Sequence, residues 1–496
     1  MNVNPITRLD YPDPDVIRVE DTYYMVSTTM HFMPGCEILQ SFDLVHWEHV
    51  TYVYETLDHT DAQQLKSGQN IYGQGMWAAS LRYHEGRFYI CFVANDTRKT
   101  YLYTSEKIDG PWKKQLIEGF YHDGSLLFDE DGRNYIVYGN DEIWITELNE
   151  DLTAPKKDGL HRLLVSDHKN PELGYEGSHI QKINGYYYIF LVHSLRDRWM
   201  RTEACFYSDS LEGEFTGGDV LCDDRGYCGQ GVAQGGIVDT PDGKWYAMLF
   251  QDSGAVGRIP ILLPVTWKDH FPFFGQNGHV PEEIEVHSTR PGYIYQPLVG
   301  SDDFCNGLLP RWQFNHDPDP RYYHLDALQG TYTITTREVC TELTQAVNTL
   351  TQRMSYPSCA AEVTVDASAL KEGDVAGLCA LQGCYAAVGI TKHHGKYEVL
   401  MLDKKEDGIL DMTEGTVVES HQMDFRLEAD FCNMKDEARC YYRVNKGDWL
   451  PIGTVHKLYF KLDHFTGCRF GLFCYAAEET GGSACFRDFK YYDVDE

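Results

Sequence analysis

DPDVIRVEDTYYMV (residues 13–26) combines a short strand, a turn and a second strand that carries tyrosines. Four similar units follow it: AASLRYHEGRFYICF (78–92), DGSLLFDEDGRNYIVYG (123–139), EGSHIQKINGYYYIFLV (176–192) and QGGIVDTPDGKWYAMLF (234–250). Two β-rich runs around a turn rich in Gly, Asp or Asn predict a β-hairpin in each unit. Hairpins that recur with periods of about 40 to 50 residues are typical of propeller blades. The five units therefore predict a five-bladed β-propeller enlarged by loops, with a β-sandwich of similar hairpins as the alternative.

The pattern changes beyond about residue 300. Alternating segments such as GTYTITT, AAEVTVDA and KYEVLML are separated by the turns HHGK, KEDG and NKGD. Such alternation predicts an antiparallel β-sandwich. We therefore expect an all-β protein with a propeller over residues 1–295 and a sandwich over residues 296–496, with STRPGYIYQPLVGSDD (288–303) as the linker.

The composition limits the partners. The 496 residues include 43 Lys and Arg against 75 Asp and Glu, for a net charge of −32. This balance argues against nucleic acid and anionic membrane surfaces, whose binding needs clustered positive charge. No apolar run approaches the roughly 18 residues that span a membrane, and the N-terminal MNVNPITRLDYPD has no signal-like apolar region. Fifteen cysteines without CxxC pairs indicate reduced thiols in a cytoplasmic protein. A small neutral or cationic partner stays open, and so does self-association into a homo-oligomer.

Acidic residues occupy equivalent places in the repeats. The five residues that lead into the first strands are Asp13, Ala78, Asp123, Glu176 and Gln234. Because the innermost strands of a propeller line its axis, these positions are expected to converge. Three like charges at one place resist joint ionisation, which favours a functional role, with a neutralising cation as the alternative. Hydrolysis of a glycosidic bond needs one protonated carboxyl for the leaving oxygen and one carboxylate that activates water or attacks carbon, and a third carboxylate can hold the pKa of the acid up.

Six stretches carry a family resemblance: YPDPDVIRVEDTYYM, STTMHFMPGCEILQSFDLVHW, GMWAASLRYHEGRFYI, DGSLLFDEDGRNYIVYG, YEGSHIQKINGYYYIF and QGGIVDTPDGKWYAMLFQDSGAVGRIPILLPVTW. Together they resemble glycoside hydrolase family 43, the propeller β-xylosidases and α-L-arabinofuranosidases, across nearly the whole chain. The resemblance implies that Asp13 is the general base, Asp123 the pKa modulator and Glu176 the general acid. It also implies that the C-terminal sandwich is an accessory domain, a concanavalin-like jelly roll.

Substrate-binding residues are expected around the three acids. Trp77 in GMWAAS is predicted to form an apolar wall for a sugar ring, with packing between blades as the alternative. The resemblance implies that Arg258 in GAVGRIP binds sugar hydroxyls in the innermost subsite. It also places Met30 and Phe32, in STTMHFMPG, in a substrate-pocket loop, although such an apolar run is more often core.

One departure from the family concerns the axis of the propeller. Many members carry a histidine there that helps hold a calcium ion or a water cluster, whereas GVAQGGIVD has Ala233 and Gln234. We therefore expect no required cofactor and no metal among the site residues, and a structural calcium ion is in doubt. His179 and His193 are expected to be structural.

The leading interpretation is an exo-acting, inverting glycosidase that releases terminal α-L-arabinofuranose, β-D-xylose or both from arabinoxylan-derived oligosaccharides. A retaining fructan-type hydrolase with Asp13 as nucleophile is one alternative, but its WMNDPNG-like opening is absent. A catalytically inactive carbohydrate-binding protein is the other, and the three retained acids argue against it. The sequence does not discriminate between the two sugars.

Overall fold

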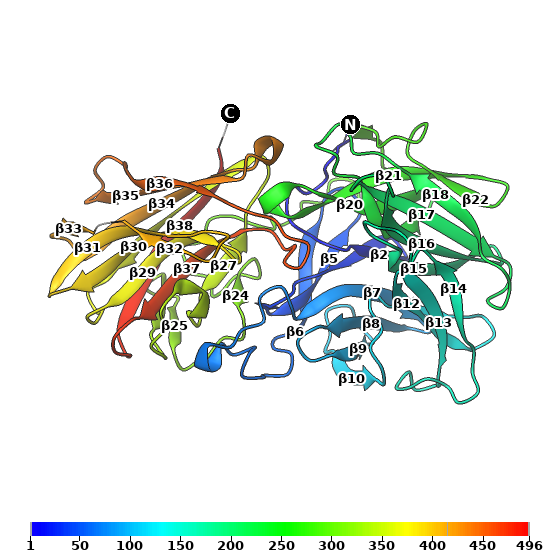
Figure 1. Ribbon diagram of the computed structural model, residues 1–496, viewed down its shortest axis with the longest axis horizontal. Coiled ribbons are helices and arrows are strands. Elements are labelled where there is room, and N and C mark those ends of the chain that lie inside the picture. The colour runs from blue at the N-terminus through cyan, green and yellow to red at the C-terminus, as the bar shows by residue number, and fades with distance from the viewer. Residues whose placement is uncertain (1, 414, 495–496) are drawn as a thin grey trace.

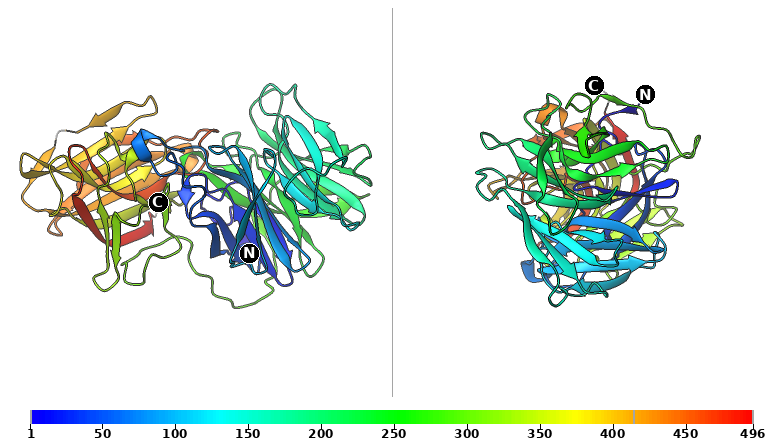
Figure 2. Two further views of the ribbon diagram at one scale, coloured as in Figure 1. Left: turned by 90° about the horizontal axis from the view of Figure 1, so that it is seen from below. Right: turned by 90° about the vertical axis from the view of Figure 1, so that its right-hand side faces the viewer.

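The computed structural model describes residues 2–413 and 415–494, and nearly all of its regular structure is β-strand (Figure 1). The N-terminal strands form five four-stranded sheets, and the C-terminal strands form two larger sheets. The two bodies lie side by side along the long axis of the molecule (Figures 1 and 2). The predicted all-β fold, a five-bladed propeller followed by an antiparallel β-sandwich, is confirmed.

Each blade is an antiparallel sheet whose four strands follow one another along the chain. The blades are, in order, β2 (Asp15–Val19), β3 (Thr22–Ser27), β5 (Gly35–Ser41) and β6 (Glu48–Tyr54); β7 (Met76–His84), β8 (Arg87–Ala94), β9 (Lys99–Ser105) and β10 (Lys113–Ile117); β11 (Ser125–Phe128), β12 (Asn134–Asn140), β13 (Glu142–Leu148) and β14 (His161–Ser166); β15 (Glu176–Ile183), β16 (Tyr186–Ser194), β17 (Arg201–Ser208) and β18 (Thr216–Leu221); and β19 (Ala233–Asp239), β20 (Trp245–Asp252), β21 (Arg258–Lys268) and β22 (Phe271–Phe274). Beside them β1 (Asn2–Val3) pairs with β23 (Glu283–Ile284).

The first strand of each blade is the innermost one. Contacts run from β2 to β7, β11, β15 and β19 and back to β2, so the five strands close a ring. The sequence forms these hairpins because turns such as Glu85–Gly86 and Asn184–Gly185 have positive φ at both residues, as two-residue type I′ turns require. At the axis Nη1 of Arg82 donates to Oδ2 of Asp15 at 2.8 Å. Nδ1 of His179 lies 3.2 Å from Oδ1 of the same carboxylate. His179 thus lies in the packed centre of the propeller.

The sandwich consists of two facing sheets. One has the strand order β32-β31-β30-β29-β37-β27-β24-β4, with β33 beside β31, and the other has the order β25-β26-β38-β28-β34-β35-β36. Their bounds are β4 (Phe32–Met33), β24 (Gln313–Asn315), β25 (Tyr323–Asp326), β26 (Thr331–Thr335), β27 (Leu350–Arg353), β28 (Ser358–Asp366), β29 (Asp374–Leu381), β30 (Tyr385–His393), β31 (Lys396–Lys404), β32 (Leu410–Met412), β33 (Thr416–Val418), β34 (Gln422–Asp430), β35 (Glu437–Val444), β36 (Leu450–Lys457), β37 (Arg469–Ala476) and β38 (Ser483–Asp493). The helical segments in the described residues are four short 3-10 turns: η1 (Lys66–Gly68), η2 (Gly254–Val256), η3 (Leu343–Gln345) and η4 (Cys432–Met434).

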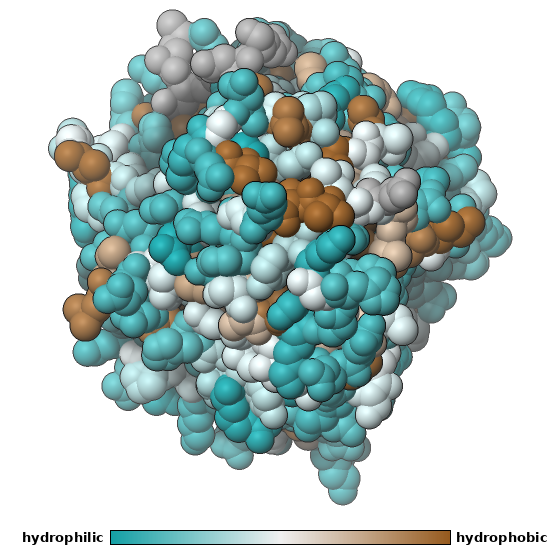
Figure 3. Space-filling view, turned by 90° about the vertical axis from the view of Figure 1, so that its left-hand side faces the viewer, coloured by the Kyte–Doolittle hydropathy of each residue, from teal (hydrophilic) through white to brown (hydrophobic). Residues whose placement is uncertain are grey.

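The space between the two sheets holds the largest hydrophobic cluster, which includes Trp312, Phe425 and Phe470. The outer end of the sandwich is covered mainly by hydrophilic side chains, with small apolar groups between them (Figure 3). This division follows from the alternating pattern, because successive residues of a strand point to opposite faces of its sheet. No helix in the described part of the chain is long and apolar enough to cross a lipid bilayer.

One propeller loop is part of the sandwich. The connection between β3 and β5 contains β4, which pairs with β24 through Phe314↔Met33 and Asn315↔Phe32. The first blade is therefore hydrogen-bonded directly to the edge of the larger sheet. The predicted linker, residues 288–303, falls between β23 and β24, and we propose that the domain boundary lies within it, between residues 295 and 296.

A buried ion pair also joins the two domains. Arg353 at the end of β27 lies 2.7 Å from the Oε2 atom of Glu37 in β5, and both side chains are almost fully buried. Arg353 also donates from Nε to the carbonyl oxygen of Asp10 at 2.8 Å. Burial works to raise the pKa of Glu37, but Arg353 and His49 outweigh it and lower that pKa from 4.5 to about 2. This pair contributes stability that is fully present above about pH 4.5 and is lost as the pH falls toward 2.

Arg353→Met is expected to lower the free energy of unfolding by about 3–5 kcal/mol, because it leaves a buried carboxylate without its main partner. Urea denaturation at pH 7 measures this loss as a lower unfolding midpoint. Arg321→Met is the matched control, since Arg321 pairs with Asp319 while 76% exposed, and exposed pairs contribute only about 0–1 kcal/mol. Equal midpoints for the two variants would show that the buried pair does not stabilise the fold.

Candidate active site

A cavity of about 180 Å³ lies at one end of the innermost strands, where the propeller meets the sandwich. Four of the five equivalent repeat positions reach its wall: Asp13, Asp123, Glu176 and Gln234. The remaining lining residues of the propeller are Trp77, His122, Asn140, Leu173, Trp199, Arg201 and Arg258, and the sandwich adds Leu462 and Phe465. The three acids therefore line one pocket, as the alignment of the repeats predicts.

Local backbone irregularities aim these side chains into the cavity. Asp13 and Asp123, just before β2 and β11, have φ values of 51° and 49°, and Gln234 in β19 has 63°. Positive φ is uncommon in residues other than glycine, and such strain concentrates at functional sites. β15 and β19 each shift register at this end, between Glu176 and His179 and between Ala233 and Gly236. Such bulges re-aim side chains next to active sites.

Three donors hold the Asp13 carboxylate. Its Oδ2 atom accepts a hydrogen bond from the Thr28 hydroxyl at 2.6 Å. Its Oδ1 atom accepts from Nε2 of Gln234 at 3.1 Å and from Nη1 of Arg258 at 2.7 Å. With only 3% of the residue exposed, Asp13 is fixed in place, and it can accept a proton from a molecule in the cavity.

Two arginines share one carboxylate beside Asp13. Arg258 and Arg201 each donate from Nε to Asp252, at 3.2 and 3.0 Å. The guanidinium of Arg258 also lies over the ring of Phe465, 3.6 Å from its centroid. Nη1 of Arg201 is buried without a hydrogen-bond partner in the described structure. Because an unpaired buried donor is costly, this N–H is suited to a ligand hydroxyl.

Asp123, Glu176 and His122 form a titrating cluster across the cavity. The Asp123 Oδ2 atom accepts from the Gly177 N–H at 3.0 Å, and Glu176 Oε2 accepts from Nδ2 of Asn140 at 2.7 Å. Burial raises the pKa of Asp123 to about 6, although His122 opposes the shift. Burial also works to raise the pKa of Glu176, but His122 outweighs it and lowers that pKa below its usual value.

One ring nitrogen of His122 and one carboxylate oxygen each of Asp123 and Glu176 lie within 4.8 Å of one another. Such spacing suits either a cation or a shared proton. Since Gly177 and Asn140 already donate to the two carboxylates, and the pKa values of all three groups are shifted, we assign the cluster to proton handling. Asp13 on one side and a proton-bearing cluster on the other can together perform acid–base hydrolysis.

The predicted binding residues separate into two groups. Trp77 and Arg258 line the cavity, as expected, and Trp77 packs edge-on against Phe465 with ring centroids 5.1 Å apart. Met30 and Phe32 do not belong to the cavity wall. Met30 is fully buried with its sulfur 3.4 Å from the Thr466 hydroxyl, and Phe32 packs under Arg469. Both lie at the interface with the sandwich because their loop pairs with β24.

Sequence reasoning missed His122, Trp199, Arg201 and Phe465. Arg201 in RWMRTEAC carries the signal that singled out Arg258, an arginine with apolar neighbours. Trp199 lies two residues before it, and its ring is 5.3 Å from the Arg201 guanidinium. Phe465 has no local signal, because only the docking of the sandwich brings it to the propeller.

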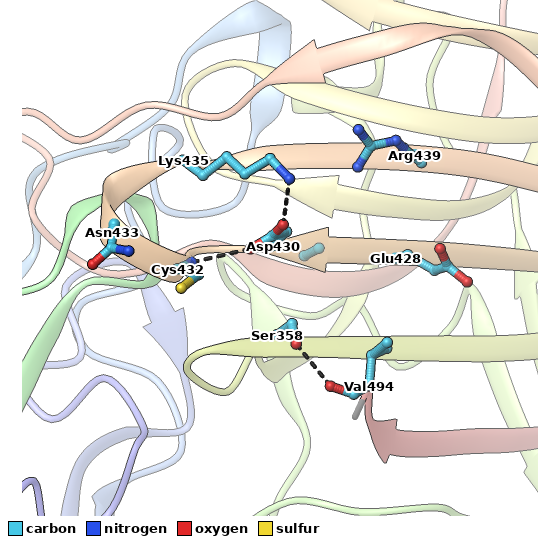
Figure 4. Close-up of a pocket in the computed structure, with 9 residues that line it drawn as sticks. Ser358, Glu428, Asp430, Cys432, Asn433, Lys435, Arg439 and Val494 are labelled. Atoms are coloured by element: carbon cyan, nitrogen blue, oxygen red, sulfur yellow. Dashed lines mark hydrogen bonds and ion pairs between the residues drawn. The ribbon is translucent and has the colours of Figure 1, made fainter. Parts of the chain in front are cut away.

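A larger cavity of about 740 Å³ on the sandwich is a weaker candidate. Figure 4 shows its lining side chains, which are mostly charged or polar, with Lys435 donating to Asp430. No aromatic ring lies among its lining residues, so it offers no face for a sugar to stack on. The three carboxylates predicted to be catalytic line the smaller cavity instead, and we propose that cavity as the functional site.

Comparison with known proteins identifies the family of the chain. The family model for Glycosyl hydrolases family 43 matches residues 3–272, and the model for the beta xylosidase C-terminal concanavalin A-like domain matches residues 301–492. A beta-xylosidase of Formosa agariphila is 27% identical over 99% of this chain and 89% of its own length. A xylosidase/arabinosidase of Butyrivibrio fibrisolvens is 23% identical over 99% of both chains.

A solved structure described as a bifunctional GH43-CE protein of Bacteroides eggerthii is also similar. It superimposes with a TM-score of 0.93 at 41% identity and covers the whole of this chain. This chain spans 64% of the length of that protein. With the family model matching more than half of its residues, the chain belongs to glycosyl hydrolase family 43 and is a glycoside hydrolase.

Proposed function

We propose that this protein is an exo-acting, inverting glycosidase that releases terminal α-L-arabinofuranose, β-D-xylose or both from arabinoxylan-derived oligosaccharides. In this proposal Asp13 activates the water, Glu176 protonates the leaving oxygen, and Asp123 tunes the pKa of the acid. The observation that carries it is the meeting of all three carboxylates in one cavity of single-sugar size. The names of the relatives, a beta-xylosidase and a xylosidase/arabinosidase, support the sugar class.

The size of the cavity supports release from chain ends. Ligand pockets for drug-sized molecules typically measure about 300–1,000 Å³, whereas this one measures about 180 Å³. Phe465 and Leu462 of the sandwich form part of its wall. One pentose ring fits such a space better than an internal stretch of a polymer does. Arg201 and Arg258 offer donors for its hydroxyl groups, and Trp77 offers an apolar face.

The surroundings of the acids support their separate roles. Asp13 accepts three hydrogen bonds and is suited to hold and deprotonate a water. Glu176 lies in the cluster that binds and exchanges protons, as a general acid must. In an inverting enzyme the water fits between the base and the anomeric carbon, so the carboxyl groups of Asp13 and Glu176 should be farther apart than the roughly 5 Å of retaining enzymes.

The test compares initial rates on 4-nitrophenyl α-L-arabinofuranoside and 4-nitrophenyl β-D-xyloside. Hydrolysis of either supports the proposal, and the ratio of rates identifies the preferred sugar. Proton NMR of fresh product should show the inverted anomer first. Initial retention, or a rapid drop in the viscosity of a xylan solution, would contradict the inverting or the exo-acting part respectively.

The expected location is the cytoplasm, where short oligosaccharides would be the substrates. All fifteen cysteines have free thiols, and ten of them are buried, which fits a reducing compartment. Fractionation of source cells with activity measured in each fraction tests this expectation, and activity outside the cells would overturn it.

Phe465→Ala is expected to lower kcat/KM by about 10- to 100-fold, mainly through a higher KM. The ring covers the Arg258 guanidinium and contributes apolar wall, and full burial of a phenylalanine is worth about 1.5–3 kcal/mol. Steady-state kinetics on the preferred aryl glycoside measures the change. Val455→Ala, at an exposed position of the same domain, is the control. If Phe465→Ala keeps the kcat/KM of the control, the sandwich takes no part in binding the sugar.

A further inference from the structure

His122 occupies a position that the proposed mechanism leaves without a role. It precedes Asp123 and lines the cavity wall near Trp77. Its Nε2 atom lies 3.6 Å from Oδ2 of Asp123 and 3.7 Å from Oε2 of Glu176. That nitrogen is buried and makes no hydrogen bond in the described structure. The nitrogen therefore lies near both carboxylates and is hydrogen-bonded to neither.

Each carboxylate has a single other donor for the oxygen that faces His122. Asp123 Oδ2 accepts from the Gly177 N–H, and Glu176 Oε2 accepts from Asn140. Both oxygens keep a further lone pair, because a carboxylate oxygen can accept two hydrogen bonds. A proton on Nε2 of His122 can therefore reach either oxygen after a small movement of the ring.

We propose that His122 stores the proton that recharges Glu176 between turnovers. This inference rests on the proposed role of Glu176 as general acid. His122 acts through Glu176, and the sugar need not touch it.

During hydrolysis Glu176 gives its proton to the leaving oxygen, and the attacking water gives a proton to Asp13. Then the Nε2–H bond of His122 breaks and an O–H bond forms at Oε2 of Glu176. Neutral His122 takes a proton from solvent, and Asp13 returns one to solvent. No oxidant, reductant or further reactant takes part.

The electrostatics of the cavity agree with this storage site. The Asp123 carboxylate is the largest cause of a raised pKa at His122, and burial opposes it. Glu176 and Asp13 add to the increase, and the pKa of His122 rises to about 9. Burial works to raise the pKa of Glu176, but His122 lowers it, and Arg201 and Arg258 lower it further. The resting cavity thus keeps a proton on the imidazole up to alkaline pH, while Glu176 alone would lose it at lower pH.

His122→Gln is expected to move the alkaline limb of the pH profile of kcat/KM to lower pH by about two units on oligosaccharides, whose leaving groups need a proton. Activity near pH 5.5 should be largely kept, and the loss at pH 8 should be about tenfold or more, since each unit above the pKa of the acid costs a factor of ten. On 4-nitrophenyl glycosides, whose leaving group departs without a proton, the limb should move much less.

His84→Gln is the matched control. His84 lies at the far end of β7, outside the cavity, with its Nε2 atom 4.0 Å from Glu85, and its replacement should leave both profiles unchanged. An alkaline limb of His122→Gln that superimposes on the wild-type limb would overturn the inference while leaving the role of Glu176 intact.

A direct titration does not depend on activity. NMR of the protein labelled at histidine should show one imidazole with a pKa near 9 that disappears in His122→Gln and falls in Glu176→Gln. A wild-type His122 that titrates near 6.5 would also overturn the storage role. Failure of the proposed function would show differently, as a Glu176→Ala enzyme that keeps its activity on oligosaccharides.

Discussion

Asp13→Ala is expected to reduce kcat/KM by roughly 10²–10⁴-fold or more, equally on oligosaccharides and on 4-nitrophenyl glycosides. General-base catalysis typically contributes about this factor. The loss is independent of the leaving group because every substrate needs an activated water. Gln234 and Arg258 both donate to Oδ1 of Asp13 and hold it in the cavity. Asp252, the carboxylate beside it, is held by Arg201 and Arg258 and does not line the cavity.

Asp13→Asn separates chemistry from structure. Asparagine keeps the size of the side chain and an oxygen that can accept from Arg258, but it is not a base. It should match the alanine variant in rate and the wild type in thermal unfolding. Initial rates on both substrate types and a melting curve measure this. A loss confined to one substrate type, or an asparagine variant as active as the wild type, would contradict the assignment.

The propeller could be predicted because its information is local. Each hairpin is encoded by a turn and two flanking β-rich runs, and residues at the same place in each unit reach the same end of the ring. This geometry is why Asp13, Asp123 and Glu176 could be named together from sequence. Ala78 shows the limit of the alignment, since Trp77, one residue earlier, is the one that lines the cavity in the second blade.

The remaining site depends on contacts that no local pattern encodes. Phe465 reaches the cavity only because the sandwich docks on the propeller. The same docking takes Met30 and Phe32 out of it, since the loop that carries them pairs with β24. An apolar loop looks the same in sequence whether it faces a sugar or another domain. The charge of a side chain also depends on groups that are distant in sequence. His122 is an example, because Glu176 and Asp13 help to raise its pKa.

His122 changes the expected pKa values of the acids. Repulsion among the three carboxylates was expected to raise the pKa of the general acid, and it does raise the pKa of Asp123, after burial, to about 6. Glu176 differs because His122 lowers its pKa below the usual value. The proton needed by the acid therefore belongs to the whole cluster, and coupled groups of this kind titrate as a unit.

Glu176→Ala is expected to lower activity on xylosyl or arabinosyl oligosaccharides by roughly 10²–10⁴-fold or more, with a much smaller loss on 4-nitrophenyl glycosides. A sugar alkoxide is a poor leaving group and needs the proton of the acid as the bond breaks, whereas 4-nitrophenolate departs without one. Asn140 donates to Oε2 of Glu176 at 2.7 Å, and Nε2 of His122 lies 3.7 Å from the same oxygen. The amide of Asn140 is not acidic, and in our proposal His122 delivers its proton only through the Glu176 carboxylate, so neither is expected to replace the acid.

The ratio of the two losses distinguishes this role from a structural one. A variant that merely disturbed the cavity would lose activity on both substrate types alike. Glu176→Gln is the matched control, because it keeps an oxygen that can accept from Asn140 while removing the acid, and it should reproduce the same ratio. A series of aryl glycosides with increasingly basic phenols should show the loss growing with the pKa of the phenol. A flat series, with equal losses for every leaving group, would remove Glu176 as the general acid, and the proton store proposed for His122 would lose its acceptor.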